Sequence, residues 1–403
     1  MPYNMRWLKI ENLQQAEKAL IQIGVDTAGI NYMKGKAITR VIKLDKVRLA
    51  AAHILKQEML SLGGDAAVHR EVVVNGISET DVLLMGNEKQ LKRLALKLRA
   101  QPFGLKGVAE ALNQLLPKVN NSPSLNLDCR GKILELGSKT MIMGILNVTP
   151  DSFSDGGMFL NHEYALEQTE SMVTQGADLI DIGGESTRPG YVSISAEEEW
   201  ERLKPIITEL VKGCPVPISV DTQKAEVAEK ALEAGVHMIN DIWGLQKDPK
   251  MAKIIGQYKA PIVIMHNKNN TNYDNLMREI IEFLSQSIDI ALDNGISQNQ
   301  IIIDPGIGFG KTPEQNMEVL SRLEELKILG FPILLGVSRK SVIGRTLDIP
   351  VEQRLEPTIA LGTLGIVAGV DILRVHDVLE NKKAALMVDQ IIRRKRGVDY
   401  EGK

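Results

Sequence analysis

Eight short apolar runs recur between residues 141 and 377, and this repetition restricts the possible folds of the chain more than any other feature. Amphipathic patterns typical of helices separate the runs. Continuous apolar runs indicate strands buried on both faces, and strands that alternate with helices build parallel sheets. Eight such units predict an α/β fold with a closed (β/α)8 TIM barrel; an open doubly wound sheet is the alternative. The runs lie at 141–148, 178–184, 217–222, 238–243, 261–266, 301–309, 332–339 and 371–377.

The chain is longer than one barrel requires, because such a barrel takes about 250 residues and the chain has 403. A cluster of Pro, Asn and Ser at 117–124 indicates a boundary between two domains. We therefore predict a smaller α+β domain at 1–120, a linker at 121–130 and the barrel at 131–397. Within the smaller domain, the helical patterns lie at 47–63 and 88–100 and the strand patterns at 67–74 and 80–86.

The role of the smaller domain stays open between a regulatory element, a dimer element, a partner-binding module and a separate activity. Residues 1–120 carry 18 Lys and Arg against 11 Asp and Glu, whereas the rest of the chain carries 30 against 40. This excess of positive charge is small for a protein that binds the phosphate backbone of a nucleic acid. We therefore expect no nucleic-acid partner and favour a basic domain docked on an acidic one over a nucleic-acid or anionic-lipid surface.

Composition excludes several other classes of protein. Hydrophobic residues make up 44% and charged residues 25% of the chain, as in globular proteins. No apolar run approaches the ~18 residues of a membrane span, and the N-terminus lacks the apolar core of a signal peptide. We therefore expect a cytoplasmic protein with no membrane partner. Cys129 and Cys214 are too few for a disulfide framework or a zinc cluster.

Polar and charged residues follow nearly every predicted strand. In a barrel the carboxyl ends of the strands meet at one rim, where barrel enzymes place their active sites. One such residue alone is typical of a helix cap or a solvated loop, but a complete ring predicts a composite active site. The ring consists of Asn147, Glu185, Thr187, Arg188, Asp221, Asn240, Asp241, His266, Asp304, Ser338, Arg339, Lys340, Arg374 and His376.

The ring divides into two groups by chemistry. One group offers donors and acceptors that suit the edge of a polar heterocycle, and unmatched groups in such a recess make it selective. Its members are Asp221, Asn240, Asp304 and Lys340. The other group suits phosphate oxygens, since Arg presents a planar pair of donors. Its members are Asn147, Arg188, Arg374 and His376, and the helix that opens at Ser341 adds free backbone amides that suit an anion.

Two loops rich in Gly, Ser and Asp, at 149–157 and 183–190, follow the first two predicted strands. We interpret them as lids that close over a ligand; plain connectors are the alternative. Residues 305–312 resemble a phosphate-binding loop, but Pro305 stands where that motif requires Gly, so we reject a nucleotide triphosphatase. His266 has no second ligand at metal spacing, which argues against zinc.

Seven motifs, in order, closely resemble those of the dihydropteroate synthase family over about residues 130–397. The resemblance does not extend to the N-terminal 120 residues. The motifs are Asn-Val-Thr-Pro-Asp-Ser-Phe-Ser-Asp-Gly-Gly at 147–157, Gly-Gly-Glu-Ser-Thr-Arg-Pro-Gly at 183–190, Asp-Thr at 221–222, Asn-Asp-Ile at 240–242, Asp-Pro-Gly-Ile-Gly-Phe-Gly at 304–310, Ser-Arg-Lys at 338–340 and Arg-Val-His-Asp at 374–377.

This resemblance implies a TIM-barrel transferase of folate biosynthesis that is a homodimer and uses Mg²⁺. The implied reaction condenses 6-hydroxymethyl-7,8-dihydropterin diphosphate with 4-aminobenzoate to give 7,8-dihydropteroate and pyrophosphate. It proceeds through a pterin cation after pyrophosphate departs, with sulfonamides as competitors of aminobenzoate. Electrostatic stabilisation of both fragments would carry the rate, and the catalytic candidates are Asp155, Asp221, Lys340 and Arg374.

The resemblance also assigns binding residues to each substrate. It implies a pterin pocket formed by Asp221, Asn240, Met265, Asp304 and Lys340. It implies diphosphate contacts from Asn147, Arg374 and His376, with Asn147 also near the Mg²⁺ ion. It implies an aminobenzoate site formed by Thr187, Arg188, Pro189, Phe309 and Ser341. This chain departs from many members of the family at Gln223, where they have an aromatic residue, and at Lys268, where they have Arg.

Two other functions compete with this interpretation. A corrinoid-type, pterin-dependent methyltransferase shares the barrel and the Asp and Asn pterin pocket, but it needs no diphosphate site, so Asn147, Lys340, Arg374 and His376 argue against it. A non-enzymatic pterin-binding or scaffolding protein predicts gaps in the ring of polar residues, and the ring is complete.

Overall fold

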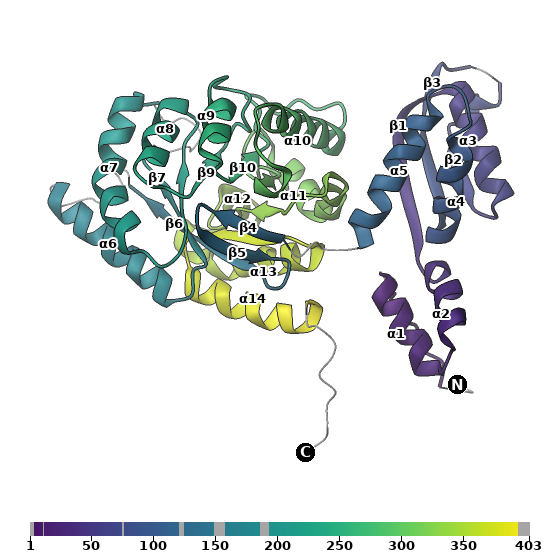
Figure 1. The fold of residues 1–403 in the computed structure, drawn as a ribbon, viewed down its shortest axis with the longest axis horizontal. Helices are drawn as coiled ribbons and strands as arrows, with labels where there is room; N and C mark the ends of the chain where they lie inside the picture. The colour runs from purple at the N-terminus through teal and green to yellow at the C-terminus, as the bar shows by residue number, and fades with distance from the viewer. Residues whose placement is uncertain are drawn as a thin grey trace. The chain divides into compact units, whose positions relative to one another are not determined.

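The computed structural model describes residues 4–10, 12–74, 76–120, 125–148, 158–185 and 193–393. These residues form two compact units, Met1–Ser122 and Pro123–Lys403, which Figure 1 shows as ribbons. None of the helices described is both long and apolar enough to cross a membrane.

The N-terminal unit is an antiparallel three-stranded sheet with helices packed on it. Its strand order is β1-β3-β2, and its core lies between the sheet and the helices, where Leu55, Leu84 and Leu94 are fully buried. The elements are α1 (Leu13–Ile23), α2 (Thr27–Met33), η2 (Lys34–Lys36), β1 (Thr39–Arg48), α3 (Leu49–Ser61), β2 (Asp65–Val68), η3 (Arg70–Val72), β3 (Glu79–Asn87), α4 (Glu88–Leu98) and α5 (Leu105–Asn120).

The predicted strand at 67–74 is wrong beyond Val68. The chain turns there into the short helix η3, and Nδ1 of His69 accepts a hydrogen bond from the backbone N–H of Glu71 at the start of that turn. The strand β1 has no counterpart among the predicted elements. It contains a register shift between Leu44 and Val47, and such a bulge breaks the alternation of apolar residues by which a strand is recognised.

The second unit is a closed barrel, which confirms the predicted (β/α)8 fold. Eight parallel strands run in the order β11-β10-β9-β8-β7-β6-β13-β12, and a parallel bridge between Ile303 and Ile333 closes the ring. The strands are β6 (Met141–Asn147), β7 (Leu179–Gly183), β8 (Ile218–Asp221), β9 (Met238–Asp241), β10 (Ile262–Met265), β11 (Ile301–Asp304), β12 (Leu334–Leu335) and β13 (Ile372–Val375). Each lies within one of the eight predicted runs.

Helices surround these strands (Figure 1), and a continuous apolar core fills the layer between them. The helices are α6 (Met158–Thr174), α7 (Ala196–Gly213), α8 (Ala225–Glu233), α9 (Met251–Tyr258), α10 (Leu276–Asp293), α11 (Pro313–Ser321), α12 (Ser341–Leu347), α13 (Leu355–Ala368) and α14 (Val378–Ile392), with short 3₁₀ turns η5 (Gln298–Gln300), η6 (Leu323–Leu329) and η7 (Val351–Gln353).

An antiparallel hairpin of β4 (Leu125–Cys129) and β5 (Lys132–Leu136) covers the amino-terminal end of the barrel. Its residues Leu127 and Leu134 belong to one apolar cluster with Met141 and other residues from the starts of the barrel strands. The segment 121–130, which we expected to be a linker, therefore contains the first strand of this hairpin. Because the hairpin covers the amino-terminal end, the carboxyl-terminal rim is the end of the barrel that can hold an active site.

Candidate active site

Most of the residues predicted for the pterin and diphosphate sites lie at the carboxyl-terminal rim. Asn147, Asp221, Met265 and Asp304 are the last residues of β6, β8, β10 and β11. Asn240 and Arg374 are the penultimate residues of β9 and β13, and Lys340 directly precedes α12. The structure therefore brings these side chains to one end of the barrel.

An ion-pair network crosses the barrel mouth and centres on Arg374. Its Nε donates a hydrogen bond to Oδ2 of Asp181 at 2.6 Å, and its Nη2 donates to Oδ2 of Asp221 at 2.8 Å. Nδ2 of Asn240 donates to the same Asp181 oxygen at 3.0 Å. The four residues come from β13, β7, β8 and β9, so the network fixes the mouth across four strands.

Asp221 keeps one oxygen available. Its Oδ1 is buried and has no hydrogen-bond partner within the described part of the chain, and such an acceptor costs about 1–3 kcal/mol if nothing pairs with it. Burial raises the pKa of Asp221 to about 7, while the neighbouring Arg374 charge opposes the rise. A ligand N–H group placed against this oxygen would satisfy it.

Lys340, Asp304 and Phe309 form a second cluster at the rim. Nζ of Lys340 donates to the backbone oxygen of Ile307 and lies 4.7 Å from the centre of the Phe309 ring. Burial lowers the pKa of Lys340 to about 8, and the Asp304 charge opposes this. Burial also raises the pKa of Asp304, against the effect of Lys340. Asp304 fixes the local loop by accepting the backbone N–H of Gly306 at 2.7 Å.

His376 is oriented by Ser338. Nδ1 of His376 lies 3.0 Å from the hydroxyl oxygen of Ser338, and the backbone N–H of His376 donates to that same oxygen at 3.1 Å. The Ser338 hydroxyl can donate to Nδ1 or accept from Nδ1–H, and in both cases the contact fixes the orientation of the imidazole ring. Ser341 is exposed at the start of α12, and Asn147 is exposed at the end of β6.

Four of the predicted site residues, Asp155, Thr187, Arg188 and Pro189, lie outside the described residues. The base of the second predicted lid is described. Glu185 accepts hydrogen bonds from the hydroxyl of Ser193 and the backbone N–H of Ile194, both at 2.8 Å. It also accepts from Gln223 at 3.1 Å and Lys224 at 3.0 Å. Glu185 therefore ties both flanks of the segment 186–192 to the turn between β8 and α8.

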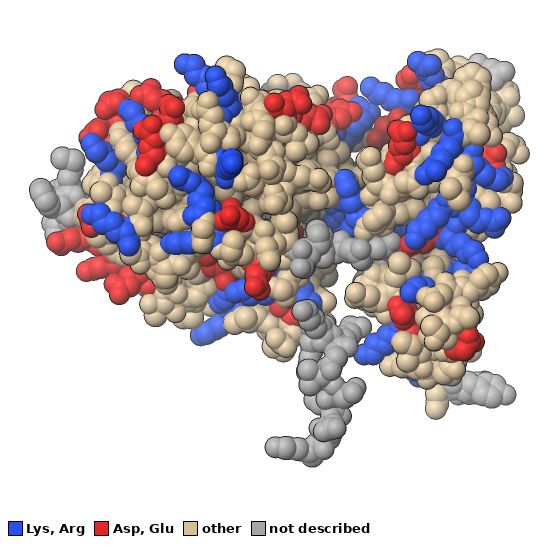
Figure 2. All heavy atoms as spheres, in the orientation of Figure 1, with Lys and Arg blue, Asp and Glu red and all other residues tan. Residues whose placement is uncertain are grey.

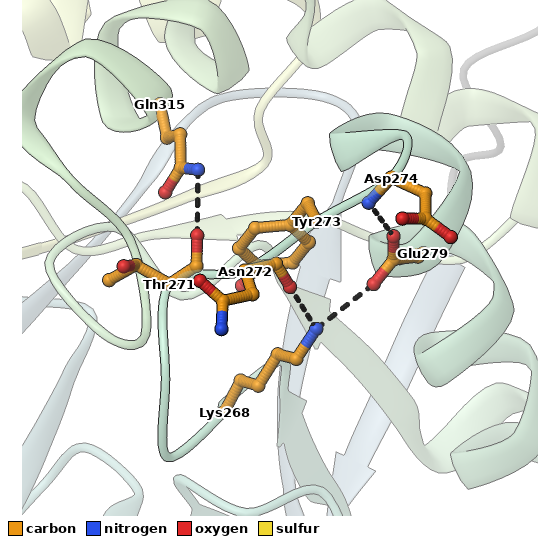
Figure 3. A pocket seen from close by; sticks show the side chains of 7 residues that line it. All are labelled: Lys268, Thr271, Asn272, Tyr273, Asp274, Glu279 and Gln315. Atoms are coloured by element: carbon orange, nitrogen blue, oxygen red, sulfur yellow. Dashed lines mark hydrogen bonds and ion pairs between the residues drawn. The ribbon is translucent and has the colours of Figure 1, made fainter.

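Lys268, the second departure from the family pattern, lines a polar cavity of about 470 Å³ between the β10–α10 loop and α11 (Figure 3). Its Nζ donates to Glu279 at 3.0 Å and to the backbone oxygen of Asn272, and it lies 4.3 Å from the centre of the Tyr273 ring. None of the residues predicted to bind substrate lines this cavity. Lys268 is thus engaged in holding its own loop.

Two buried polar residues at the rim are absent from the predicted site. Asp181 is fully buried. The sequence feature that could have identified it is a single Asp inside an otherwise apolar strand, because a buried carboxylate requires a partner. Lys311 is the buried lysine of the loop that resembles a phosphate-binding motif; its Nζ lies 2.9 Å from Nδ1 of His266.

The described residues hold no group of three or more His, Cys, Asp or Glu that could bind a metal ion. This does not conflict with Mg²⁺, which keeps several waters and is usually held by one or two protein groups together with substrate phosphates. The amide oxygen of Asn147 is a ligand of the hard type that Mg²⁺ prefers, and its exposed position at the end of β6 fits that role.

The barrel is the part of the chain that is similar to most of the known proteins described here. Residues 143–376 match the family described as pterin binding enzyme. The dihydropteroate synthase of Clostridium beijerinckii is 54% identical over 264 residues, which cover 65% of this chain and 98% of that protein. The solved structure of the dihydropteroate synthase from Clostridium difficile, obtained in the presence of pteroic acid, is 56% identical with a TM-score of 0.64, and the match covers 65% of this chain and 100% of that one.

A different kind of relative also matches the N-terminal unit. A probable bifunctional folylpolyglutamate synthase/dihydropteroate synthase of Halobacterium salinarum is 40% identical over 387 residues. The match covers 94% of this chain and 46% of that protein. Similarity therefore extends over both units in this relative, whereas it stops at about two thirds of the chain in the shorter ones.

Proposed function

Because the chain belongs to the dihydropteroate synthase family of pterin-binding enzymes, we infer that it joins 6-hydroxymethyl-7,8-dihydropterin diphosphate to 4-aminobenzoate in folate biosynthesis, yielding 7,8-dihydropteroate and pyrophosphate. The observation that carries this function is the barrel mouth itself. There an unsatisfied Asp221 oxygen, Lys340 and Asp304 lie close to the Arg374 guanidinium.

The pterin ring is held at the deeper part of the mouth. A pterin presents N–H donors and ring acceptors along one edge, so Oδ1 of Asp221 accepts from it, and Asn240 and Asp304 supply further polar contacts. The Lys340 ammonium donates to a ring acceptor, and the buried side chain of Met265 packs against the ring face. Selectivity follows because any ring that lacks these groups leaves buried polar atoms unpaired.

The diphosphate lies on the cationic side of the mouth. Arg374 and His376 donate to its oxygens. Asn147 would hold the Mg²⁺ ion, which would supply positive charge to offset the negative charge of the departing pyrophosphate. Support for this assignment comes from the position of Arg374 beside the pterin residues and from the orientation of His376, whose ring is held by Ser338.

Departure of pyrophosphate breaks the bond between the pterin methylene carbon and the diphosphate oxygen and leaves a cation delocalised over the ring. The Asp221 carboxylate, and Asp155 from the first predicted lid, stabilise that cation. The amine of aminobenzoate then attacks the methylene carbon and loses a proton. No covalent intermediate with the enzyme is required.

Aminobenzoate occupies the outer part of the mouth. Phe309 and the exposed Ser341 flank that part of the rim, and Thr187, Arg188 and Pro189 of the second predicted lid complete the site. Sulfonamides, which resemble aminobenzoate in shape and charge, compete there in this proposal. A solved structure of the Yersinia pestis dihydropteroate synthase with a sulfonamide drug complex, 40% identical to this chain, is consistent with it.

We also propose that the protein is a homodimer that acts in the cytoplasm. The neighbouring helices α13 and α14 expose large apolar side chains, among them Leu364, Val367, Met387 and Ile391, and exposed apolar patches of this kind are typical of interfaces. Met387→Glu should lower the sedimentation coefficient to that of a monomer, whereas Leu292→Glu on α10 should leave it unchanged. Both cysteines are free thiols, as expected in a reducing compartment.

Pyrophosphate release by the purified chain tests the catalytic proposal. The complete mixture of pterin diphosphate, aminobenzoate and Mg²⁺ should release pyrophosphate and form dihydropteroate in equal amounts. Omitting aminobenzoate should stop product formation. Methyl transfer from methyltetrahydrofolate, with no pyrophosphate release from pterin diphosphate, would instead favour a methyltransferase.

A further inference from the structure

Lys311 and His266 form a buried pair at the barrel rim that the proposed reaction does not use. Nζ of Lys311 lies 2.9 Å from Nδ1 of His266, and the two residues are only 8% and 2% exposed. His266 directly follows β10, and Lys311 ends the loop after β11. The pair therefore links two adjacent strands at the rim.

The amine of Lys311 also holds its own loop. It donates to the backbone oxygens of Gly306 at 2.9 Å and Phe309 at 3.1 Å. With His266 this makes three partners, which is the full hydrogen-bonding capacity of a lysine amine. A buried amine is stable only when it is paired in this way. The hydrogen bonds from the Lys311 amine therefore hold the backbone of the loop between Gly306 and Phe309 in place.

The same loop carries contacts of the predicted pterin and aminobenzoate sites. The backbone N–H of Gly306 donates to Asp304, the backbone oxygen of Ile307 accepts from Lys340, and the ring of Phe309 lies under Lys340. A shift of the loop would move all three groups at once.

The loop backbone packs closely against the segment that follows β10. Gly306 has φ +68°, and a Cβ atom at this residue would lie 1.9 Å from the backbone oxygen of His266. Gly310 has φ +56°, and a Cβ atom there would lie 2.5 Å from the backbone oxygen of Lys268. The loop backbone is thus pressed against the chain that follows β10, and only glycine permits this approach.

We propose that Lys311 is a positioning residue that, anchored by His266, holds the loop 305–310 so that Asp304, Lys340 and Phe309 meet the pterin and aminobenzoate. This inference rests on the proposed function and extends it to a residue that touches neither substrate. The segment resembles a phosphate-binding loop, but its lysine binds protein carbonyls instead of phosphate.

The choice of histidine as the partner has a physical reason. If the amine is charged, Nδ1 of a neutral imidazole accepts a hydrogen bond from it; if the amine is neutral, Nδ1–H donates to it. The pair is therefore satisfied in both protonation states. An asparagine at this position also offers an acceptor or a donor, because its amide can present either oxygen or nitrogen, whereas a leucine offers neither.

Lys311→Met in the full chain tests the proposal, because it removes the three hydrogen bonds and keeps a side chain of similar length. Titration with 6-hydroxymethylpterin, which lacks the diphosphate, should show affinity weakened about tenfold or more, since a displaced loop weakens its contacts to the ring and tenfold corresponds to about 1.4 kcal/mol. Binding of inorganic pyrophosphate with Mg²⁺ should be unchanged, because Asn147, Arg374 and His376 lie outside the loop. Lys253→Met, the same change at an exposed lysine of α9, is the control and should behave as wild type.

His266→Asn and His266→Leu separate positioning from simple packing. The Asn variant should keep most of the pterin affinity, and the Leu variant should lose as much as Lys311→Met. Wild-type pterin affinity in Lys311→Met overturns the proposal. If that variant does not fold, equal pterin affinities of the two His266 variants overturn it. Failure of the wild-type chain to release pyrophosphate would instead reject the proposed function, while the titrations still report on the loop.

Discussion

Asp181 shows how one buried charge organises the site. Its carboxylate lies inside β7, where an unpaired charge would be strongly unfavourable, and it accepts hydrogen bonds from Arg374 and Asn240. Arg374 is thereby held between two carboxylates, Asp181 and Asp221. The guanidinium cannot rotate away without leaving both unpaired, so Asp181 orients the group that we propose to bind the diphosphate.

Asp181→Asn should therefore lower both stability and turnover. Removing one partner of a buried ion pair costs about 3–5 kcal/mol, and a less firmly held Arg374 should reduce the rate of pyrophosphate release by more than the loss of folded protein explains. Thermal unfolding and turnover per folded molecule are the measurements. Asp178→Asn, directly before the same strand, breaks contacts to Lys139 and Lys382 and should reduce stability alone; equal turnover in both variants would contradict the assignment.

Lys340 should make pterin binding sensitive to alkaline pH. Burial lowers its pKa to about 8, so its ammonium is fully charged well below that value and loses its proton as the pH rises through it. Affinity for the pterin should fall over the same range. Titrations of wild type and Lys340→Met check this, because the variant should bind weakly and lack the Lys340 component of the pH dependence. Identical profiles in the two proteins would refute it.

At the level of single residues, the sequence indicates which residues lie at the barrel rim better than it indicates their hydrogen-bond partners. Asp221 and Asp304 end apolar runs, which is why they can be recognised as site candidates. The pairing of Asp181 with Arg374 joins residues 193 positions apart, and no local pattern encodes it. Lys311 belongs to a motif that fails as a phosphate loop, and two of its partners are backbone oxygens, which every sequence contains.

The predictability of the elements follows their burial. All eight barrel strands can be recognised because both their faces are apolar. In contrast, β1 has one open face and a bulge. The strand β4 alternates apolar and polar residues over only five positions, and β5 is equally short. Short alternating segments next to Pro and Asn are easily mistaken for a connector.

The hairpin should contribute to stability without affecting catalysis, because it lies at the end of the barrel opposite to the site. Leu127 is fully buried against the strand starts, so Leu127→Ala should reduce the free energy of unfolding by about 2–5 kcal/mol and leave the turnover of the folded enzyme unchanged. Urea unfolding and pyrophosphate release are the measurements. Ile133→Ala, at a hairpin residue that is 55% exposed, should change neither, and a fall in turnover for Leu127→Ala would show that the two ends communicate.

At the scale of the whole molecule, the two units differ in charge. Groups of Lys and Arg stand out on the visible face of the N-terminal unit, whereas acidic and basic side chains are interspersed on the barrel (Figure 2). The shorter relatives match only about two thirds of this chain yet are covered almost completely themselves. The barrel is thus the part that the family shares, and the N-terminal unit is an addition that the bifunctional relatives also carry.

Deletion of Met1–Ser122 should leave a folded and active barrel. The barrel has its own closed sheet and core, and no proposed substrate contact comes from the N-terminal unit. Pyrophosphate release by Pro123–Lys403 should stay within about threefold of the full chain, a difference of less than about 1 kcal/mol. Circular dichroism checks the fold. An inactive but folded barrel would place part of the site in the N-terminal unit.

The network around Arg374 also has a consequence for synthesis of the protein. Asp181 and Asp221 emerge from the ribosome long before Arg374, which belongs to the last strand of the barrel. Until that strand is translated, the two carboxylates have no cation to share, and the first and last strands of the ring cannot pair. A nascent or truncated chain thus lacks Arg374 and His376 of the proposed diphosphate site, and the enzyme gains its activity only when the barrel closes.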